Sequence, residues 1–268
     1  MCSSDLIIAA MVSGTGTLIG GTGYEFLARA LSGGDGSPAA RAAAGTAVRD
    51  WAASTLRAVA DGRRPLRAVI HPLGFTCLPV ERAGRDGVCV HLWSPRPVGA
   101  VPAASAIHAH CWALTSYALL GELENSLITV ADAVPAQCAP AAPSPPAAGP
   151  ASPSASPVYQ VLRVRSRGDI DELSPTPRLV HCRESRRELI TAGDTYDIPA
   201  GVFHATDVAP EAETVTIALG RMVAGIADLS LAPAGAVGHQ VRRRRCDQDG
   251  TAATARHVLD RLQMTLAR

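Results

Sequence analysis

The sequence predicts a mainly β fold, a sandwich or a small barrel, with helices before it and a short helix after it. Short apolar runs separated by Gly and Pro fill the middle of the chain, and several of them alternate with a period of two. A regular succession of strand and helix is not present, which disfavours a doubly wound sheet. The 268 residues suffice for one compact domain with appendages.

Composition excludes some classes of function. Apolar residues make up 47% of the chain, and 25 basic residues against 24 acidic ones leave a net charge of +1. A general binder of nucleic acid or of an anionic membrane needs a basic surplus, so we expect neither partner. Aromatic residues are only 4% of the chain, which leaves few platforms for stacking bases or sugars.

The cysteines predict reduced thiols in a cytoplasmic protein. Their number is odd and they form no C-x-x-C pair, which argues against a disulfide framework. We expect most of them to behave as small buried apolar side chains. The seven positions are Cys2, Cys77, Cys89, Cys111, Cys138, Cys182 and Cys246.

We assign no function to residues 1–20. The apolar run at 6–12 is short, is interrupted by Ser, Gly and Thr at 13–17, and has no Arg before it, so neither a membrane span nor a signal peptide is supported. The glycines that follow do not have the dinucleotide-binding spacing. Residues 1–6 match one reading frame of a sequencing adapter, and resequencing the locus tests the hypothesis that they are not native.

Residues 21–64 predict a helical flank. The ranges 24–31 and 39–60 suit helices, and in the second Trp51, Leu56 and Val59 recur at helical spacing to form one apolar stripe. We expect this stripe to pack on the outside of a sheet. Gly and Pro at 62–65 end the second helix.

Short strands follow the flank. Their apolar runs alternate between two faces, most clearly at 162–165 and 214–217. The predicted strands are 66–70, 75–80, 88–93, 117–120, 126–130, 158–164, 179–182, 196–198 and 214–219.

These runs define a barrel over 65–222, with an inserted loop at 133–157 and a C-terminal extension at 223–268. The loop consists almost entirely of Ala, Pro and Ser, a composition that cannot bury enough apolar surface to offset ordering. In the extension, the four arginines at 242–245 predict a solvated basic turn, and 251–266 predicts a helix.

Two histidine-bearing segments stand out in the barrel. In an extended strand, residues two apart face the same side, so His108 and His110 can project together into the interior. The second segment, 193–204, predicts a turn, a short strand at 196–198, a tight turn at 199–201 and His204 on the next strand.

The second segment resembles the second motif of the cupin superfamily, G-x5-P-x-G-x2-H. Gly193, Pro199, Gly201 and His204 match every fixed position of this motif. The resemblance implies a jelly-roll β-barrel over roughly 66–222.

The first cupin motif is matched in part by His108, His110 and Gly121. Together with His204, the two histidines are implied to bind a divalent metal. Its usual glutamate ligand is replaced by Leu114, and Pro102 stands where the motif has a glycine. The implied site is therefore three-histidine. Imidazole donors suit several transition metals, and Fe(II) leads, with Zn, Ni, Mn and Cu as alternatives.

A three-histidine cupin with preceding helices resembles the cysteine or thiol dioxygenase branch. That resemblance implies a mononuclear non-haem iron enzyme that binds a small substrate, such as a thiol, together with O2. Two features of the branch are missing: no Arg lies near His71 and Pro72, and Thr115 stands where its crosslinked cysteine belongs. Cysteine itself is therefore not carried over as the substrate.

Three further side chains are candidates for the interior, as a proton donor or an anion clamp: Tyr196, Tyr117 and Arg163. Two alternative functions stay open, a Zn- or Ni-dependent isomerase, lyase or hydrolase, and a non-catalytic small-ligand-binding barrel. Cupin barrels commonly pair, so the resemblance also implies a homodimer. The remaining histidines are expected to serve packing or surface roles; they are His71, His91, His181, His239 and His257.

Overall fold

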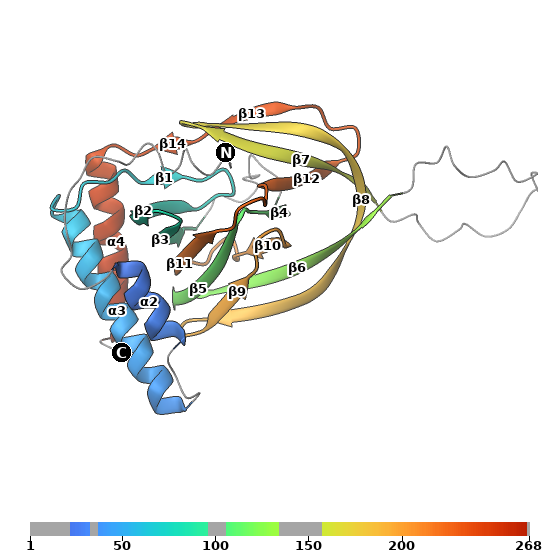
Figure 1. Cartoon of the computed structure of the whole chain (residues 1–268). Helices are drawn as coiled ribbons and strands as arrows, with labels where there is room; N and C mark the ends of the chain where they lie inside the picture. Colours follow the sequence, from blue (N-terminus) through green and yellow to red (C-terminus); the bar gives the residue numbers. More distant parts are fainter. Residues whose placement is uncertain (1–21, 33–36, 96–105, 134–156, 267–268) are drawn as a thin grey trace, which may run out of the picture.

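The computed structural model describes residues 22–32, 37–95, 106–133 and 157–266. The expectations for residues 1–20 and for nearly all of the 133–157 loop therefore lie outside the described residues. In the described part, two antiparallel sheets face each other and helices lie against one of them (Figure 1). The predicted mainly β fold with helices before and after it is confirmed.

The first sheet, sheet A, lies next to the helices. In spatial order its strands are β14 (Arg244–Arg245), β1 (Val69–Ile70), β2 (Thr76–Ala83), β3 (Asp86–Trp93), β11 (Thr214–Met222), β5 (Trp112–Leu120) and β9 (Thr195–Ile198).

The second sheet, sheet B, forms the opposite wall. In spatial order its strands are β13 (His239–Arg242), β8 (Ile170–Thr191), β6 (Glu122–Asp132), β10 (Phe203–Asp207), β4 (His108–Ala109), β12 (Leu229–Pro233) and β7 (Val158–Arg167).

Strand β8 is far longer than the predicted run at 179–182. Its first half pairs with β7 and its second half with β6, so it arches along one side of the molecule (Figure 1). The sequence conceals this strand because few of its side chains are buried and many are polar, and backbone pairing on both sides defines it instead.

Three helices are described: α2 (Gly23–Ser32), α3 (Pro38–Ala60) and α4 (Gln248–Leu266). They confirm the predicted helices to within a few residues. Local chemistry sets their starts: Ser37 accepts a hydrogen bond from the Ala40 amide, and Glu81 of β2 accepts from the first two amides of α2. None of the helices in the described ranges is long and apolar enough to cross a membrane.

Sheet A has two chemically different faces. On β3, Val88, Val90 and Leu92 are buried in one cluster with Leu56 of α3 and Leu262 of α4. The residues between them on β3 point to the opposite face, because side chains alternate along a strand. That opposite face lines the space between the two sheets.

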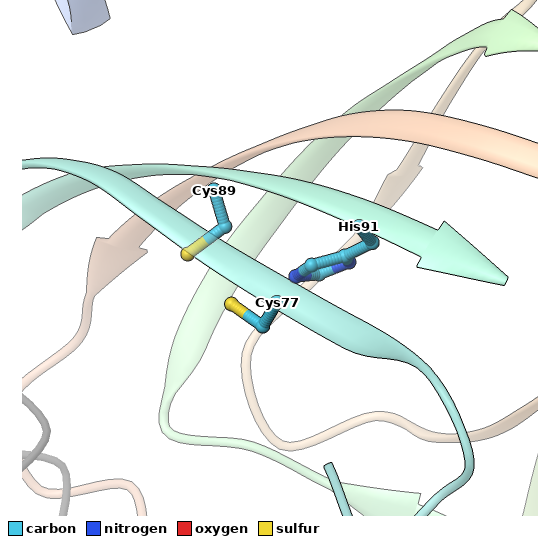
Figure 2. A group of neighbouring side chains, drawn as sticks. All are labelled: Cys77, Cys89 and His91. Carbon is cyan, nitrogen blue, oxygen red and sulfur yellow. The ribbon is translucent and has the colours of Figure 1, made fainter. Parts of the chain in front are cut away.

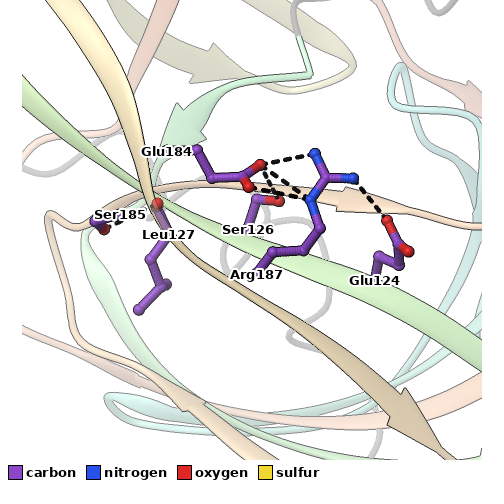
Figure 3. A network of polar contacts seen from close by, with 6 residues as sticks. All are labelled: Glu124, Ser126, Leu127, Glu184, Ser185 and Arg187. Carbon is purple, nitrogen blue, oxygen red and sulfur yellow. Dashed lines mark hydrogen bonds and ion pairs between the residues drawn. The ribbon is translucent and has the colours of Figure 1, made fainter.

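The outer surface of sheet B carries ion pairs instead of a helix layer. Arg187 of β8 contacts Glu184 on its own strand and Glu124 on β6, and Ser126 donates a hydrogen bond to Glu184 (Figure 3). These groups are largely exposed, so solvent screens each pair and it contributes little to stability. The network therefore marks a solvated face and keeps Glu124 away from the interior.

The prediction of a solvated basic turn at 242–245 is wrong. Arg242 ends β13, Arg244 and Arg245 form β14, and Arg243 joins the two strands, so the sheets extend beyond residue 222. The side chain of Arg243 is only 11% exposed and bonds Asp171 at 2.6 Å and Ser166 at 3.1 Å, while Arg245 bonds Asp169 at 2.5 Å. A composition argument missed this because the acidic partners lie more than seventy positions earlier in the chain.

Substitution of Gly121 should reveal how closely the turn between β5 and β6 packs against the neighbouring backbone. Its φ is +73°, and a Cβ there would lie 2.4 Å from the Glu213 carbonyl oxygen. We expect Gly121→Ala to lower the free energy of unfolding by about 3 kcal/mol, because backbone strain and a backbone clash act together. Gly168 is the matched control: its φ is +60° but nothing lies within 4 Å, so Gly168→Ala should cost only about 1 kcal/mol. Equal losses in urea denaturation would contradict the clash.

Candidate metal centre

A cavity of about 610 Å³ lies between the two sheets. Both walls contribute polar side chains to it, among them His108, His110 and His204 from sheet B and its flanks. This volume is within the range of small-molecule sites. The cavity is therefore the natural place to look for chemistry.

The three histidines predicted as metal ligands come together in this cavity. His108 lies on β4, His110 follows it by two residues, and His204 on β10 is the direct register partner of His108. The intervening Ala109 packs in an apolar cluster that includes Phe203. The alternation expected from sequence is thus what brings His108 and His110 to one side.

Each of these imidazoles is held by the backbone through Nδ1. The Nδ1 atoms lie 3.0 Å from the Ala106 oxygen for His108, 2.6 Å from the Trp112 oxygen for His110, and 3.0 Å from the Val202 oxygen for His204. A carbonyl only accepts, so Nδ1 carries the proton and Nε2 keeps its lone pair. This arrangement is how proteins orient histidines that bind a metal.

The spacing of the three rings is near that of three imidazoles on a shared cation. Their centroids are 4.3 Å apart for His108 and His204, 4.8 Å for His110 and His204, and 6.1 Å for His108 and His110. Three Nε2 ligands at about 2.1 Å from one metal would hold the centroids roughly 4.5–5.2 Å apart. The two separations that involve His204 lie close to this range, while the His108–His110 separation exceeds it by about 1 Å. A shared transition metal therefore requires the rings of His108 and His110 to move toward each other.

Burial keeps these histidines neutral. It lowers the pKa of His110 to about 3, with the neighbouring His108 acting in the same direction. Burial likewise lowers the pKa of His204 well below its usual value, and that of His108 to a lesser degree, with Asp228 opposing the shift at His108. Neutral imidazole is the form that binds a metal.

The backbone around His110 is pinned from two sides. The Gly201 amide donates to the His110 carbonyl at 2.9 Å, and the Cys111 amide donates to Asp228 Oδ1 at 2.7 Å. Gly201 has a φ of +79°, which explains why the tight turn before β10 carries a glycine. Both predicted histidine segments are therefore joined directly.

Of the three other side chains predicted to face the interior, one lines the cavity and two do not. Tyr196 of β9 lines the cavity, as expected, and burial raises the pKa of its phenol. Tyr117 does not line it: its side chain packs against α3, with its hydroxyl beside Gly45, because it lies on the helix-facing side of β5. Arg163 is exposed, and its neighbour Val164 faces the cavity instead. An interior role for Tyr117 and Arg163 does not fit these positions.

Sequence reasoning missed a second polar group on the sheet A wall. Cys77, Cys89 and His91 line the cavity, and Arg82 donates from Nη2 to the Cys89 Sγ at 3.6 Å. The available signal was the C-x-H spacing at 89 and 91, which has the same two-residue period as His108 and His110. The sequence predicts only a packing or surface role for His91.

Comparisons with known proteins add little at the level of sequence. No protein-family model matches the chain, and no curated protein matches it. One similar solved structure is hydroxypropylphosphonic acid epoxidase from S. wedmorenis, at 12% identity and a TM-score of 0.26, covering 55% of this chain and 49% of the epoxidase. The chain thus spans about half the length of that protein.

Another is the L-ribose isomerase of Cellulomonas parahominis solved with L-ribose, at 12% identity and a TM-score of 0.31, covering 68% of this chain and 88% of the isomerase. Both similarities are too distant to say anything about the reaction of this protein. What the structure itself shows is two seven-stranded antiparallel sheets with a histidine-lined cavity between them.

His71, at the edge of the cavity, gives a testable pH dependence. Its Nδ1 accepts a hydrogen bond from the Leu73 amide at 3.2 Å, and burial together with the charge of Arg243 holds its pKa well below the usual value. The unfolded chain takes up this proton near pH 6.5 while the folded protein does not, so stability falls as the pH drops below about 6.5.

We expect His71→Asn to weaken this dependence by up to about 1.4 kcal/mol per pH unit, because the amide oxygen keeps the acceptor but does not titrate. Urea denaturation of the metal-free protein between pH 7 and 5 measures the slope. His239→Asn, at an exposed position on β13, is the control and should leave it unchanged. An unchanged slope in His71→Asn would contradict the assignment.

Proposed function

We propose that this protein is a metal-dependent cupin enzyme in which His108, His110 and His204 hold one divalent transition metal. The observation that carries the proposal is the common orientation of the three imidazoles. Each directs Nδ1 to a backbone carbonyl, which leaves three neutral Nε2 donors on rings that line one cavity, with centroids 4.3–6.1 Å apart. A packing role for three histidines would not require this shared tautomer.

The donor set favours chemistry at an open coordination position. Three neutral ligands would not offset the charge of a bound divalent metal, and they would leave at least one coordination position open for a reactant. At that position the metal would supply Lewis-acid polarisation or oxygen activation. The protein's own contribution is to fix the orientation of the three rings through their backbone hydrogen bonds. Asp228 lies near enough to His108 to influence its pKa and adds negative charge at that end.

Two cavity side chains are suited to handling a substrate. Tyr196 keeps its phenolic proton at neutral pH, because burial raises its pKa, and can donate it to a substrate oxygen or sulfur. Arg82 offers a guanidinium inside the cavity. A small molecule with an anionic group is therefore the substrate class that suits this lining.

Within this class we propose a mononuclear Fe(II) dioxygenase acting on a small molecule such as a thiol. The support for this finer proposal is the resemblance of both histidine motifs to three-histidine thiol dioxygenases. The same all-imidazole donor set also suits Zn or Ni, which favours an isomerase, lyase or hydrolase as the second candidate. Dependence on oxygen separates the two.

Metal content tests the ligand assignment. We expect His108→Ala and His204→Ala each to lose about one equivalent of metal per chain relative to wild type, because two imidazoles bind a divalent metal much more weakly than three. Plasma mass spectrometry after reconstitution measures it, and His239→Ala is the matched histidine control. Full metal content in His204→Ala, with a normal circular dichroism spectrum, would refute the assignment.

Oxygen dependence tests the reaction class. We expect the iron-loaded protein to consume O2 with a member of a panel of small thiols and acids, and to lose turnover under anaerobic conditions. An oxygen electrode and product analysis by mass spectrometry measure both. Turnover that persists without oxygen would move the assignment to the Zn or Ni alternative.

A further inference from the structure

A compact group of sulfur and nitrogen ligands lies on the sheet A wall of the cavity. The Sγ atoms of Cys77 and Cys89 and a ring nitrogen of His91 all lie within 4.8 Å of one another (Figure 2). Within the described residues, Cys77, Cys89 and His91 are the set of His, Cys and acidic side chains whose ligand atoms all lie this close to one another. It is distinct from the three histidines of sheet B.

The pairing of β2 and β3 creates the group. Cys77 is the direct register partner of His91, and Cys89 precedes His91 by two residues, so all three side chains project from the same face. The ring of His91 is flanked by Phe75, with centroids 4.6 Å apart. The ligands are thus positioned by backbone register and by aromatic packing.

Space is left in front of the group. On the neighbouring strand β11, the register partners of His91 and Cys89 are Thr216 and Ala218, which are both small and both line the cavity. A cation bound to the three ligands would therefore face open cavity on its fourth side. This is the arrangement of a zinc site that keeps one position for water or a substrate.

A disulfide fits the two cysteines less well. Cys77 and Cys89 are diagonal neighbours across an antiparallel pair, and such residues have Cα atoms about 7–8 Å apart. Disulfides span Cα separations of about 4.4–6.8 Å, so bridging would require the strands to move. Both cysteines are free in the structure. Their sulfurs approach each other without the backbone geometry that a covalent bond needs.

We propose that Cys77, Cys89 and His91 form a second metal site, for Zn²⁺, with a fourth coordination position open to the cavity. Two thiolates and one imidazole are a donor set that favours this cation over the harder Mg²⁺ and Ca²⁺. Zn–S bonds of about 2.3 Å place tetrahedral ligands about 3.7 Å apart, so side-chain rotations of about 1 Å complete the site. Arg82, in contact with Cys89, stabilises the thiolate form that binds.

Cobalt provides a test that the three-histidine site cannot imitate. We expect Co²⁺ added to the reduced, metal-free full-length protein to produce thiolate-to-cobalt charge-transfer absorption, which Zn²⁺ then abolishes by displacement. Only sulfur ligands give this absorption. We expect Cys77→Ser and Cys89→Ser each to lose most of it, and Cys182→Ser, a half-buried cysteine outside the group, to keep it.

The outcomes separate this site from the proposed function. His108→Ala and His204→Ala should retain the absorption whether or not they lose their own metal. Its absence in wild type at several equivalents of Co²⁺, or its persistence in Cys89→Ser, would overturn the site and leave the thiols as packing groups. Circular dichroism checks folding, and if Cys89→Ser does not fold, Cys77→Ser and His91→Gln decide the question.

Discussion

The period-two alternation of side chains along sheet A is the constraint on which the rest of the structure depends. Val88, Val90 and Leu92 on β3 must be apolar because they bury the sheet against the helices. Burying one such side chain is worth about 1.5–3 kcal/mol, so the register of these strands is strongly specified. Once that face is fixed, the residues that alternate with these three on β3 must face the cavity, because successive side chains point to opposite sides of a strand.

This constraint explains both the chemistry that reaches the cavity and the chemistry that does not. Cys89 and His91 alternate with the apolar residues of β3 and therefore face inward. Tyr117 lies on the helix-facing side of β5 and packs in the core between sheet A and the helices, so its phenol cannot act as a proton donor in the cavity. A shift of one residue in register would exchange these roles.

Burial in the cavity disfavours protonation of the histidines and so keeps them in the form that binds a metal cation. Burial lowers the pKa of His110 to about 3, and His108 and His204 are shifted in the same direction. Their lone pairs are therefore available at neutral pH. Arg243 also lines the cavity, but its charge is paired with that of Asp171, because a largely buried charge without a partner would cost several kcal/mol.

The sequence by itself determined the fold class, the helices and the two histidine segments, because these rest on local patterns. Apolar periodicity marks α3 and β3, and His108, His110 and His204 lie in motifs whose turns require Gly121 and Gly201 at positive φ. Local patterns carry the identity of such residues, and strand alternation carries the direction in which they point.

Only the tertiary structure decided which distant residues meet. The ion pair between Arg243 and Asp171, the length of β8 and the approach of Cys77 to Cys89 all depend on strand pairing between separate segments. Pairing partners are chosen by the packing of whole sheets, and no short window of sequence contains that information. For the same reason, the sequence could name His108 and His110 as neighbours but could not place Cys77 beside His91.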